Sequence, residues 1–154
     1  MKQRIYIDTS VVGGYYDEEF KEATQKLFQR LENNEVVFVV SDLLELELIN
    51  APFHVRDLLN KFTTDKFERV QLTQESVSLA EMYISERVVG KTSIEDCRHI
   101  ALATINKVDV LASWNFKHIV NLDRIRGYNS VNLRHGYSMI EIRSPKDLVN
   151  YENN

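Results

Sequence analysis

The feature that most constrains the fold is a series of short, continuous apolar runs that alternate with segments of helical periodicity. Residues 36–40, VVFVV, are the clearest run, with polar residues on both sides. A strand that is buried on both faces has this pattern, whereas a strand with one solvent-facing side alternates between apolar and polar residues. Residues 109–113 have a similar pattern, and residues 4–7 combine β-branched and aromatic side chains, which favour strands. Strands of this kind belong to parallel sheets that helices cover on both faces.

In the intervening segments, apolar residues recur every three or four positions, as they do in an amphipathic helix. This spacing predicts helices over residues 20–31, 43–49, 74–88 and 93–108, with another opening at Pro52 and a short one near 120–126. Residues 67–72 and 139–143 are weaker strand candidates. The alternation predicts an α/β fold, a three-layer α/β/α sandwich with a central, mainly parallel sheet.

Length and composition indicate one compact domain. The chain has 154 residues, of which 44% are hydrophobic, enough for one core and too few for two ordinary domains, so we expect a single domain over residues 1–154. The one cysteine, Cys97, excludes an internal disulfide, and the first residues have a strand pattern rather than that of a signal segment. No apolar run approaches the roughly 20 residues that cross a bilayer. We therefore expect a cytoplasmic protein without a membrane role.

The charge is unevenly distributed along the chain. The net charge of −4 argues against tight, non-specific binding of nucleic acid, which usually needs a basic excess. Residues 15–50 nevertheless contain nine acidic and three basic side chains, while residues 115–146 contain six Lys or Arg and two acids. An acidic metal pocket beside a basic flank suits a phosphodiesterase, although solvated surfaces also show such imbalance. Arg124, Arg126 and Arg134 are candidates for contact with RNA phosphates, or simply part of a solvated face.

Glu47 is an acid in an unfavourable place. At about 100° per residue, it falls inside the arc of the predicted helix that carries the leucines at 43, 44, 46 and 48. Burying an unpaired carboxylate is costly, so such a group usually faces a cation, a metal ion or a hydrogen-bond donor. The alternative is a salt bridge at the edge of the apolar face.

Asp8 and Asp96 occupy the positions where α/β folds gather functional groups. Asp8 ends the first predicted strand, and ligands in open α/β sheets bind beyond the carboxyl ends of the strands. Asp96 lies in the first turn of the helix predicted to begin at Ser93, bordering its buried stripe. Each acid also has an ordinary explanation: Asp8 as the cap of the following turn, and Asp96 as part of a capping box with Ser93.

Together the three acids predict a site for a hard divalent cation. Strand ends and helix starts on one edge of a parallel sheet bring distant acids together, and Mg²⁺ or Mn²⁺ prefers carboxylate and water ligands. Such an ion can polarise a phosphodiester and lower the pKa of an attacking water. Asn115, just past the strand at 109–113, is a further candidate through its amide oxygen, or a simple turn residue. Asp109 begins that strand and is therefore placed at the opposite edge.

Three segments that contain these acids resemble, in order and spacing, the successive acidic motifs of the PIN domain family: residues 7–10 (IDTS), 41–48 (SDLLELEL) and 95–103 (EDCRHIALA). The resemblance covers nearly the whole chain. It implies an Mg²⁺- or Mn²⁺-dependent ribonuclease with Asp8, Glu47 and Asp96 as metal ligands. Many members are VapC-type toxins of type II toxin–antitoxin pairs, so it also implies an RNA substrate, a cognate antitoxin and a homodimer.

The sequence departs from the family pattern at the fourth acidic position, where Asn115 replaces the common aspartate. The missing negative charge should weaken a second metal ion more than the first, which predicts low, Mn²⁺-requiring or absent activity. Thr9, Ser113 and His118 are supporting candidates around this position.

Two other functional classes remain open at this point. The first is a non-catalytic PIN-like module that binds RNA or a protein, which Asn115 and the acidic net charge favour. The second is a phosphohydrolase of small phosphate esters, which would ordinarily have a second aspartate where Ser10 stands.

Overall fold

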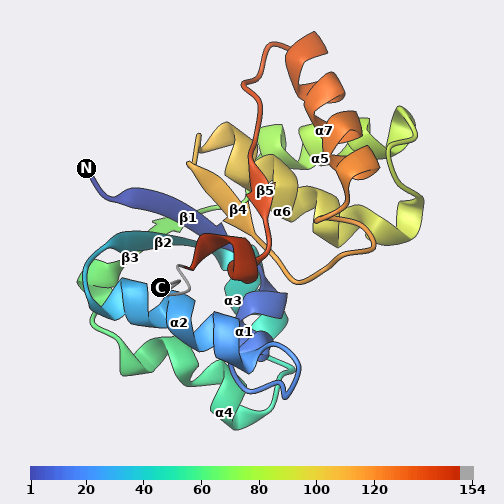
Figure 1. Cartoon of the computed structure of the whole chain (residues 1–154). Coiled ribbons are helices and arrows are strands. Elements are labelled where there is room, and N and C mark those ends of the chain that lie inside the picture. The colour runs from blue at the N-terminus through green and yellow to red at the C-terminus, as the bar shows by residue number, and fades with distance from the viewer. Residues whose placement is uncertain (150–154) are drawn as a thin grey trace.

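The computed structural model describes residues 1–149 and has a five-stranded sheet at its centre (Figure 1). The strands are β1 (Gln3–Ile7), β2 (Val36–Ser41), β3 (Phe67–Val70), β4 (Val110–Ala112) and β5 (Ile142–Arg143). Their order across the sheet is β3-β2-β1-β4-β5, and every neighbouring pair is parallel. The predicted α/β class with a central parallel sheet is therefore confirmed.

Helices cover both faces of this sheet. They are α1 (Thr9–Gly14), α2 (Lys21–Glu32), α3 (Asp42–Leu48), α4 (Phe53–Arg56), α5 (Gln74–Ser85), α6 (Ile94–Ile105) and α7 (Leu122–Arg134). Successive side chains of β1 point to opposite faces, so Tyr6 packs in the core with α5, α6 and α7, while Ile5 and Ile7 pack in the core with α1 and α2. Figure 1 shows the two helical layers on either side of the strands. The three-layer sandwich predicted from the alternating pattern is thus present.

The chain reverses direction across the sheet between β1 and β4. It proceeds from β1 to β2 and β3 on one side and then returns to place β4 and β5 on the other. At such a switch point the connections from two neighbouring strands leave in opposite directions, and a crevice forms at the carboxyl ends of those strands. Ile7 is in register with Ala112, so Asp8 and Ser113 follow at the same edge. The topology therefore selects one location for a functional site.

Several predicted elements have different bounds in the structure. The helix opening at Pro52 is one turn, α4, followed by a 3₁₀ helix at Leu58–Lys61. The short helix expected near residues 120–126 continues to Arg134, and the strand expected over 139–143 contracts to β5. Asn129 explains this last difference, because its side chain bonds both the backbone N–H and the carbonyl of Ile140 and withdraws them from the sheet.

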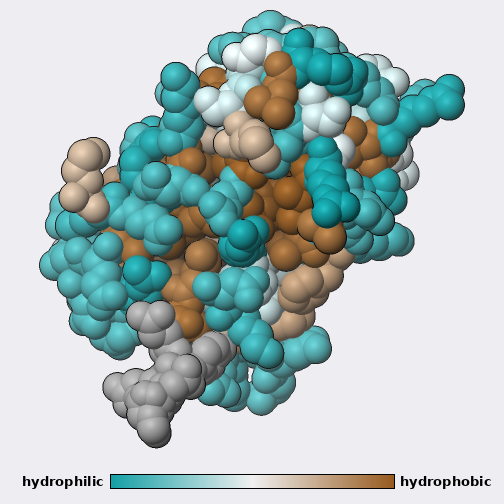
Figure 2. All heavy atoms as spheres, turned by 45° about the horizontal axis from the view of Figure 1, so that its top comes forward, coloured by the Kyte–Doolittle hydropathy of each residue, from teal (hydrophilic) through white to brown (hydrophobic). Residues whose placement is uncertain are grey.

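The surface mixes polar and apolar side chains. Figure 2 shows one face on which hydrophobic side chains are exposed near the middle and hydrophilic side chains surround them. No helix within residues 1–149 is both long and apolar enough to span a membrane.

Candidate active site

Asp8 lies at the switch point, directly after β1, and is 4% exposed. Its Oδ1 accepts hydrogen bonds from Ser10 Oγ (2.5 Å) and from the N–H of Val11 (3.3 Å), and its Oδ2 accepts one from Ser113 Oγ (2.6 Å). The bond from Val11 makes Asp8 the N-cap of α1, so the capping explanation is confirmed together with the position at the strand end. Burial raises the pKa of Asp8, and these hydrogen bonds offset the shift only in part.

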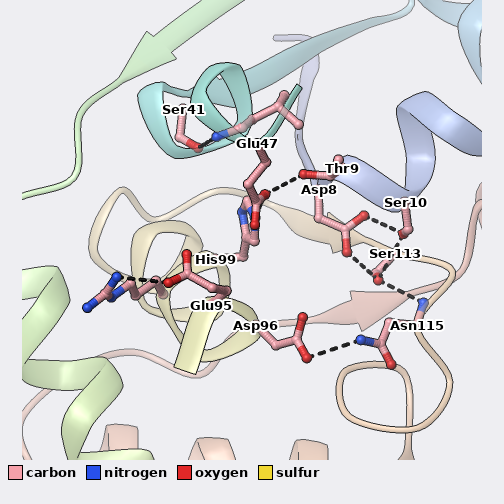
Figure 3. Close-up of polar contacts among 12 residues, drawn as sticks. Asp8, Thr9, Ser10, Ser41, Glu47, Glu95, Asp96, His99, Ser113 and Asn115 are labelled. Carbon is pink, nitrogen blue, oxygen red and sulfur yellow. Dashed lines mark hydrogen bonds and ion pairs between the residues drawn. The ribbon is translucent and has the colours of Figure 1, made fainter. Parts of the chain in front are cut away.

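Two serines, one from α1 and one from the end of β4, hold this carboxylate against the loop after β4 (Figure 3). Ser113 Oγ, while donating to Asp8, accepts a hydrogen bond from the N–H of Asn115 (3.0 Å). Ser10 Oγ similarly donates to Asp8 and accepts from the N–H of Trp114 (2.9 Å). Each hydroxyl thus donates its proton to Asp8 and accepts a backbone N–H of the loop after β4. These bonds fix the carboxylate relative to that loop.

Asp96 lies in the first turn of α6, as predicted, and is partly exposed. Burial raises the pKa of its carboxyl group, and the nearby Asp8 carboxylate adds to that increase. The expected capping box with Ser93 is wrong: the Ser93 side chain makes no cap hydrogen bond, and its buried Oγ has no partner among the described residues. The residue before α6 ends a short 3₁₀ helix, Lys91–Ser93, rather than an extended segment, and an N-cap side chain normally needs extended backbone there.

Asn115 orients its amide in a definite way. Its Oδ1 accepts hydrogen bonds from the N–H groups of Lys117 (3.2 Å) and His118 (3.0 Å), so its Nδ2 is directed to Asp96 Oδ2 (3.2 Å). Asn115 is thus the turn residue of the β4 loop, one of the two readings left open by the sequence. Its amide oxygen, the expected neutral ligand, is engaged by the backbone, and its N–H₂ group partly compensates the charge of Asp96.

Glu47 projects from α3 and its side chain is 27% exposed. Its Oε1 accepts hydrogen bonds from Thr9 Oγ1 and from His99 Nε2, the latter at 2.7 Å. Burial on its own raises the pKa of Glu47, but the hydrogen bond and electrostatic attraction of His99, together with the hydrogen bond from Thr9, outweigh it and hold the pKa below the usual value. The buried side of α3, which was predicted to carry four leucines, is narrower than predicted, because Leu46 is 64% exposed.

His99 is the member of the site that sequence reasoning missed. It is 3% exposed on α6, a helix that is buried over most of its circumference. The signal in the sequence was a histidine within the apolar segment HIALA, where a polar ring needs a buried partner.

The three acids approach one region from β1, α3 and α6 (Figure 3). Within residues 1–149, however, no three His, Cys, Asp or Glu side chains are close enough to form a ready-made metal site. The donor set nevertheless fits Mg²⁺ or Mn²⁺, because these ions are commonly held by one or two carboxylates, with water and substrate phosphates completing the shell. Asp8 also has no Lys or Arg within ion-pair distance in the described part of the chain. A buried carboxylate with uncharged donors is a suitable ligand for a cation.

The remaining predicted residues have separate surroundings. Thr9 bonds Glu47 and Ser113 bonds Asp8, so both contact the acids they were expected to support. His118 lies near enough to Asp96 to lower its pKa, against the larger effect of burial. The buried Nδ1 of His118 has no hydrogen-bond partner within residues 1–149.

The three arginines lie along α7, and two of them contact the segment after α5. Arg124 donates to the carbonyl of Val88, and Arg134 pairs with Glu86 at the other end of α7. The 1.5 Å rise per residue separates these two positions by about 15 Å along the helix. Arg126 is exposed between them.

Comparison with known proteins supports the fold. No protein-family model and no curated protein matches the sequence. Among solved structures, the VapBC complex of Salmonella typhimurium bound to DNA contains a similar chain with TM-score 0.58 and 14% identity, covering 94% of this chain and 99% of that one. The chain has the fold of the VapC toxins.

Two further structures show the same likeness. A chain of VapBC2 from Rickettsia felis, bound to a DNA fragment of its promoter, has TM-score 0.58 and 12% identity, with 92% of this chain and 98% of that one covered. VapC20 of Mycobacterium tuberculosis, described as a Sarcin-Ricin loop cleaving toxin, has TM-score 0.57 and 12% identity over 73% and 91% of the two chains. At these identities the similarity concerns the fold.

Proposed function

We propose that this protein is an endoribonuclease that hydrolyses RNA phosphodiester bonds with the help of Mg²⁺ or Mn²⁺. The observation that carries the proposal is the pair Asp8 and Asp96, two carboxylates with raised pKa values at the switch point of a parallel sheet. The RNA-cleaving activity in the description of VapC20, which shares the fold, supports RNA as the substrate.

In this mechanism Asp8 and Asp96 would hold the divalent ion, with Glu47 as the third acid. A bound Mg²⁺ or Mn²⁺ supplies polarisation of the phosphodiester and lowers the pKa of an attacking water. Ser10 and Ser113 hold Asp8 in one orientation, which reduces the reorganisation needed for binding. The lowered pKa of Glu47 keeps its carboxylate ionised at neutral pH and therefore available as a ligand for the ion.

A cleavage assay tests the proposal directly. Single-stranded RNA is incubated with the wild-type chain, Asp8→Ala and Glu47→Ala in Mg²⁺, Mn²⁺ or EDTA, with Asp123→Ala as a matched control because Asp123 is exposed at the start of α7. We expect cleavage by the wild type and the control in a divalent ion, and at least a hundredfold loss in the two site variants. Equal cleavage by all four proteins would identify a contaminating nuclease and refute the proposal.

The partners follow from the same similarity. Two of the structural neighbours are VapBC toxin–antitoxin complexes bound to DNA. We propose that this chain is the toxin of a type II pair, that it binds a cognate antitoxin protein and that it forms a homodimer. Expression together with the product of the adjacent gene, followed by affinity purification and light scattering, tests both associations.

A second candidate is a catalytically weakened module that binds RNA or a protein. The orientation of Asn115 favours it, because an amide N–H₂ occupies the place where the usual aspartate would add a charge next to Asp96. Asn115→Asp separates the two functions in the same assay. A strong gain of cleavage identifies a weakened nuclease, whereas RNA binding without cleavage by either protein identifies a binding module.

A further inference from the structure

A chain of buried hydrogen bonds leads from the interior of the protein to Glu47. Ser41 Oγ lies 2.8 Å from Tyr6 Oη, Tyr6 Oη lies 2.6 Å from His99 Nδ1, and His99 Nε2 lies 2.7 Å from Glu47 Oε1. Ser41, Tyr6 and His99 are 1%, 0% and 3% exposed, so water does not compete for these bonds. The chain connects β2, the central strand β1, α6 and α3.

The bond at Ser41 determines the direction of the whole chain. Ser41 is the N-cap of α3, and its Oγ accepts the N–H of Leu44 (3.1 Å). Its hydroxyl proton has Tyr6 Oη as its acceptor among residues 1–149. If Tyr6 donated to Ser41 instead, the buried hydroxyl proton of Ser41 would have no acceptor among residues 1–149, which is unfavourable. Ser41 therefore donates to Tyr6.

The remaining protons follow from this first bond. The one hydroxyl proton of Tyr6 is free to be donated to His99 Nδ1, which accepts it and therefore carries no proton. The ring proton is then on Nε2, where it is donated to Glu47 Oε1. Every donor in this series of hydrogen bonds has an acceptor, and the last acceptor is the carboxylate of Glu47.

We propose that His99, in the tautomer with its proton on Nε2, is the positioning residue that holds Glu47 for the divalent ion. This inference rests on the proposed function. Tyr6 lies on the central strand, where its main chain is bonded to β2 and β4, so His99 is oriented by a rigid element. Thr9, the residue after Asp8, donates to the same Glu47 oxygen and places that carboxylate relative to Asp8. Outer hydrogen-bond partners of this kind commonly change metal affinity by 10- to 100-fold when they are removed.

The tautomer is measured first, on the full chain in EDTA. Long-range proton–nitrogen correlation spectra of the isotope-labelled protein distinguish a protonated from an unprotonated ring nitrogen, and the spectrum of His99→Gln assigns the His99 signals among the four histidines. We expect an unprotonated Nδ1 and a protonated Nε2 in the wild type, and loss of this preference in Tyr6→Phe, which lacks the donor. A protonated Nδ1 in the wild type would overturn the proposal.

Binding of Mn²⁺ is measured second, from the free-ion signal in electron paramagnetic resonance. His99→Leu removes both ring nitrogens and should weaken Mn²⁺ binding by about 10- to 100-fold. His99→Gln keeps a donor for Glu47 and should bind closer to the wild type. His135→Leu is the matched control, because His135 Nε2 contacts Glu86 Oε2 at the same distance, 2.7 Å, at the far end of α7. The control should bind as the wild type does.

The outcomes separate this inference from the proposed function. If the wild type binds Mn²⁺ and both His99→Leu and Tyr6→Phe bind it equally well, the positioning role is wrong while the metal site stands. If the wild type binds no Mn²⁺, the metal of the proposed function fails and the positioning role fails with it. If circular dichroism shows that His99→Leu is unfolded, Tyr6→Phe, which keeps the ring volume, decides the question by the same measurement.

Discussion

Asp8 and Glu47 lie at the same edge of the sheet, yet their surroundings shift their pKa values in opposite directions. Burial dominates at Asp8 and raises its pKa, whereas at Glu47 the hydrogen bond and electrostatic attraction of His99, together with the hydrogen bond from Thr9, overcome burial and lower it. The folded chain therefore holds one acid that is costly to ionise beside one that ionises readily. Groups whose pKa values are pushed apart in this way are typical of sites that handle protons or metal ions.

The raised pKa of Asp8 predicts that, in EDTA, the free energy of unfolding of the wild type falls relative to that of Asp8→Asn as the pH rises from about 4 to 8. The folded state binds this proton more tightly than the unfolded state, so ionised Asp8 lowers the free energy of unfolding at high pH. This relative loss should vanish as the pH falls toward about 4, the value for an unfolded aspartate. Urea unfolding between pH 4 and 8 measures it, with Asp123→Asn as the exposed control. A difference in stability between the two proteins that does not change between pH 4 and 8 would contradict the burial argument.

A second prediction at this scale concerns Ser113. Ser113→Ala removes the donor to Asp8 Oδ2 and the acceptor of the Asn115 N–H, and both lie in or near the core. The free energy of unfolding should fall by about 1–3 kcal/mol because buried polar groups lose their partners. Ser130→Ala, at an exposed position of α7, should change it by less than about 0.5 kcal/mol. Equal stability of the two variants in urea would show that the Ser113 bonds contribute nothing.

The acids of the site could be placed from the sequence, but their partners could not. Strand ends and helix starts are local features, so Asp8 and Asp96 follow from the pattern of residues around them. The partner of Glu47, His99, lies 52 residues away, and the direction of the Asn115 amide depends on the turn it caps. Whether Asp8, Glu47 and Asp96 share a metal ion stays a prediction.

At the scale of elements, the strands were easier to predict than the helices around the site. Burial on both faces gives β2 and β4 a pattern that needs no tertiary information. Helix α1 forms where the sequence predicts a turn after Asp8, although Gly13 and Gly14 are poor helix formers. Helix α7 extends beyond the predicted residues 120–126, although its later turns carry many polar residues and Gly127. Packing against α5 and against Val88, which follows α5 and closely approaches Gly127, overrides that composition.

The two glycines of α1 predict opposite effects of the same substitution. A Cβ at Gly14 would lie 2.7 Å from Trp114 Nε1, whose hydrogen bond to Thr24 Oγ1 it would disturb. Gly14→Ala should therefore lower the free energy of unfolding by about 1–3 kcal/mol. Gly13 has no atom within 4 Å of such a Cβ, so Gly13→Ala should raise it by up to about 1 kcal/mol through helix propensity. Thermal and urea unfolding of the pair measure both effects, and a destabilised Gly13→Ala would contradict the packing argument.

At the scale of the whole molecule, the position of the site follows from the topology rather than from any single motif. In the order β3-β2-β1-β4-β5, the direction in which successive strands are added changes between β1 and β4. The acids at 8 and 96 lie where these two strands end. The alternating pattern predicted a parallel sheet, but it could not specify the strand order, because strands of equal apolarity have no local label for their neighbours. The strand order depends on which helices cover each face of the sheet, and this is visible only in the structure.

Because the site joins segments from both halves of the sheet, binding of a divalent ion should stabilise the entire fold. A ligand that binds only the folded state adds about 2.7 kcal/mol to the free energy of unfolding at 100 times its dissociation constant, and about 1.4 kcal/mol more for each further tenfold. We expect the urea midpoint of the wild type to rise with Mn²⁺ concentration in this way. Asp8→Asn should gain little, so the wild type should become more stable relative to this variant as Mn²⁺ is added. Asp123→Asn should follow the wild type throughout, and a wild-type midpoint that is the same in Mn²⁺ and in EDTA would refute ion binding at this edge of the sheet.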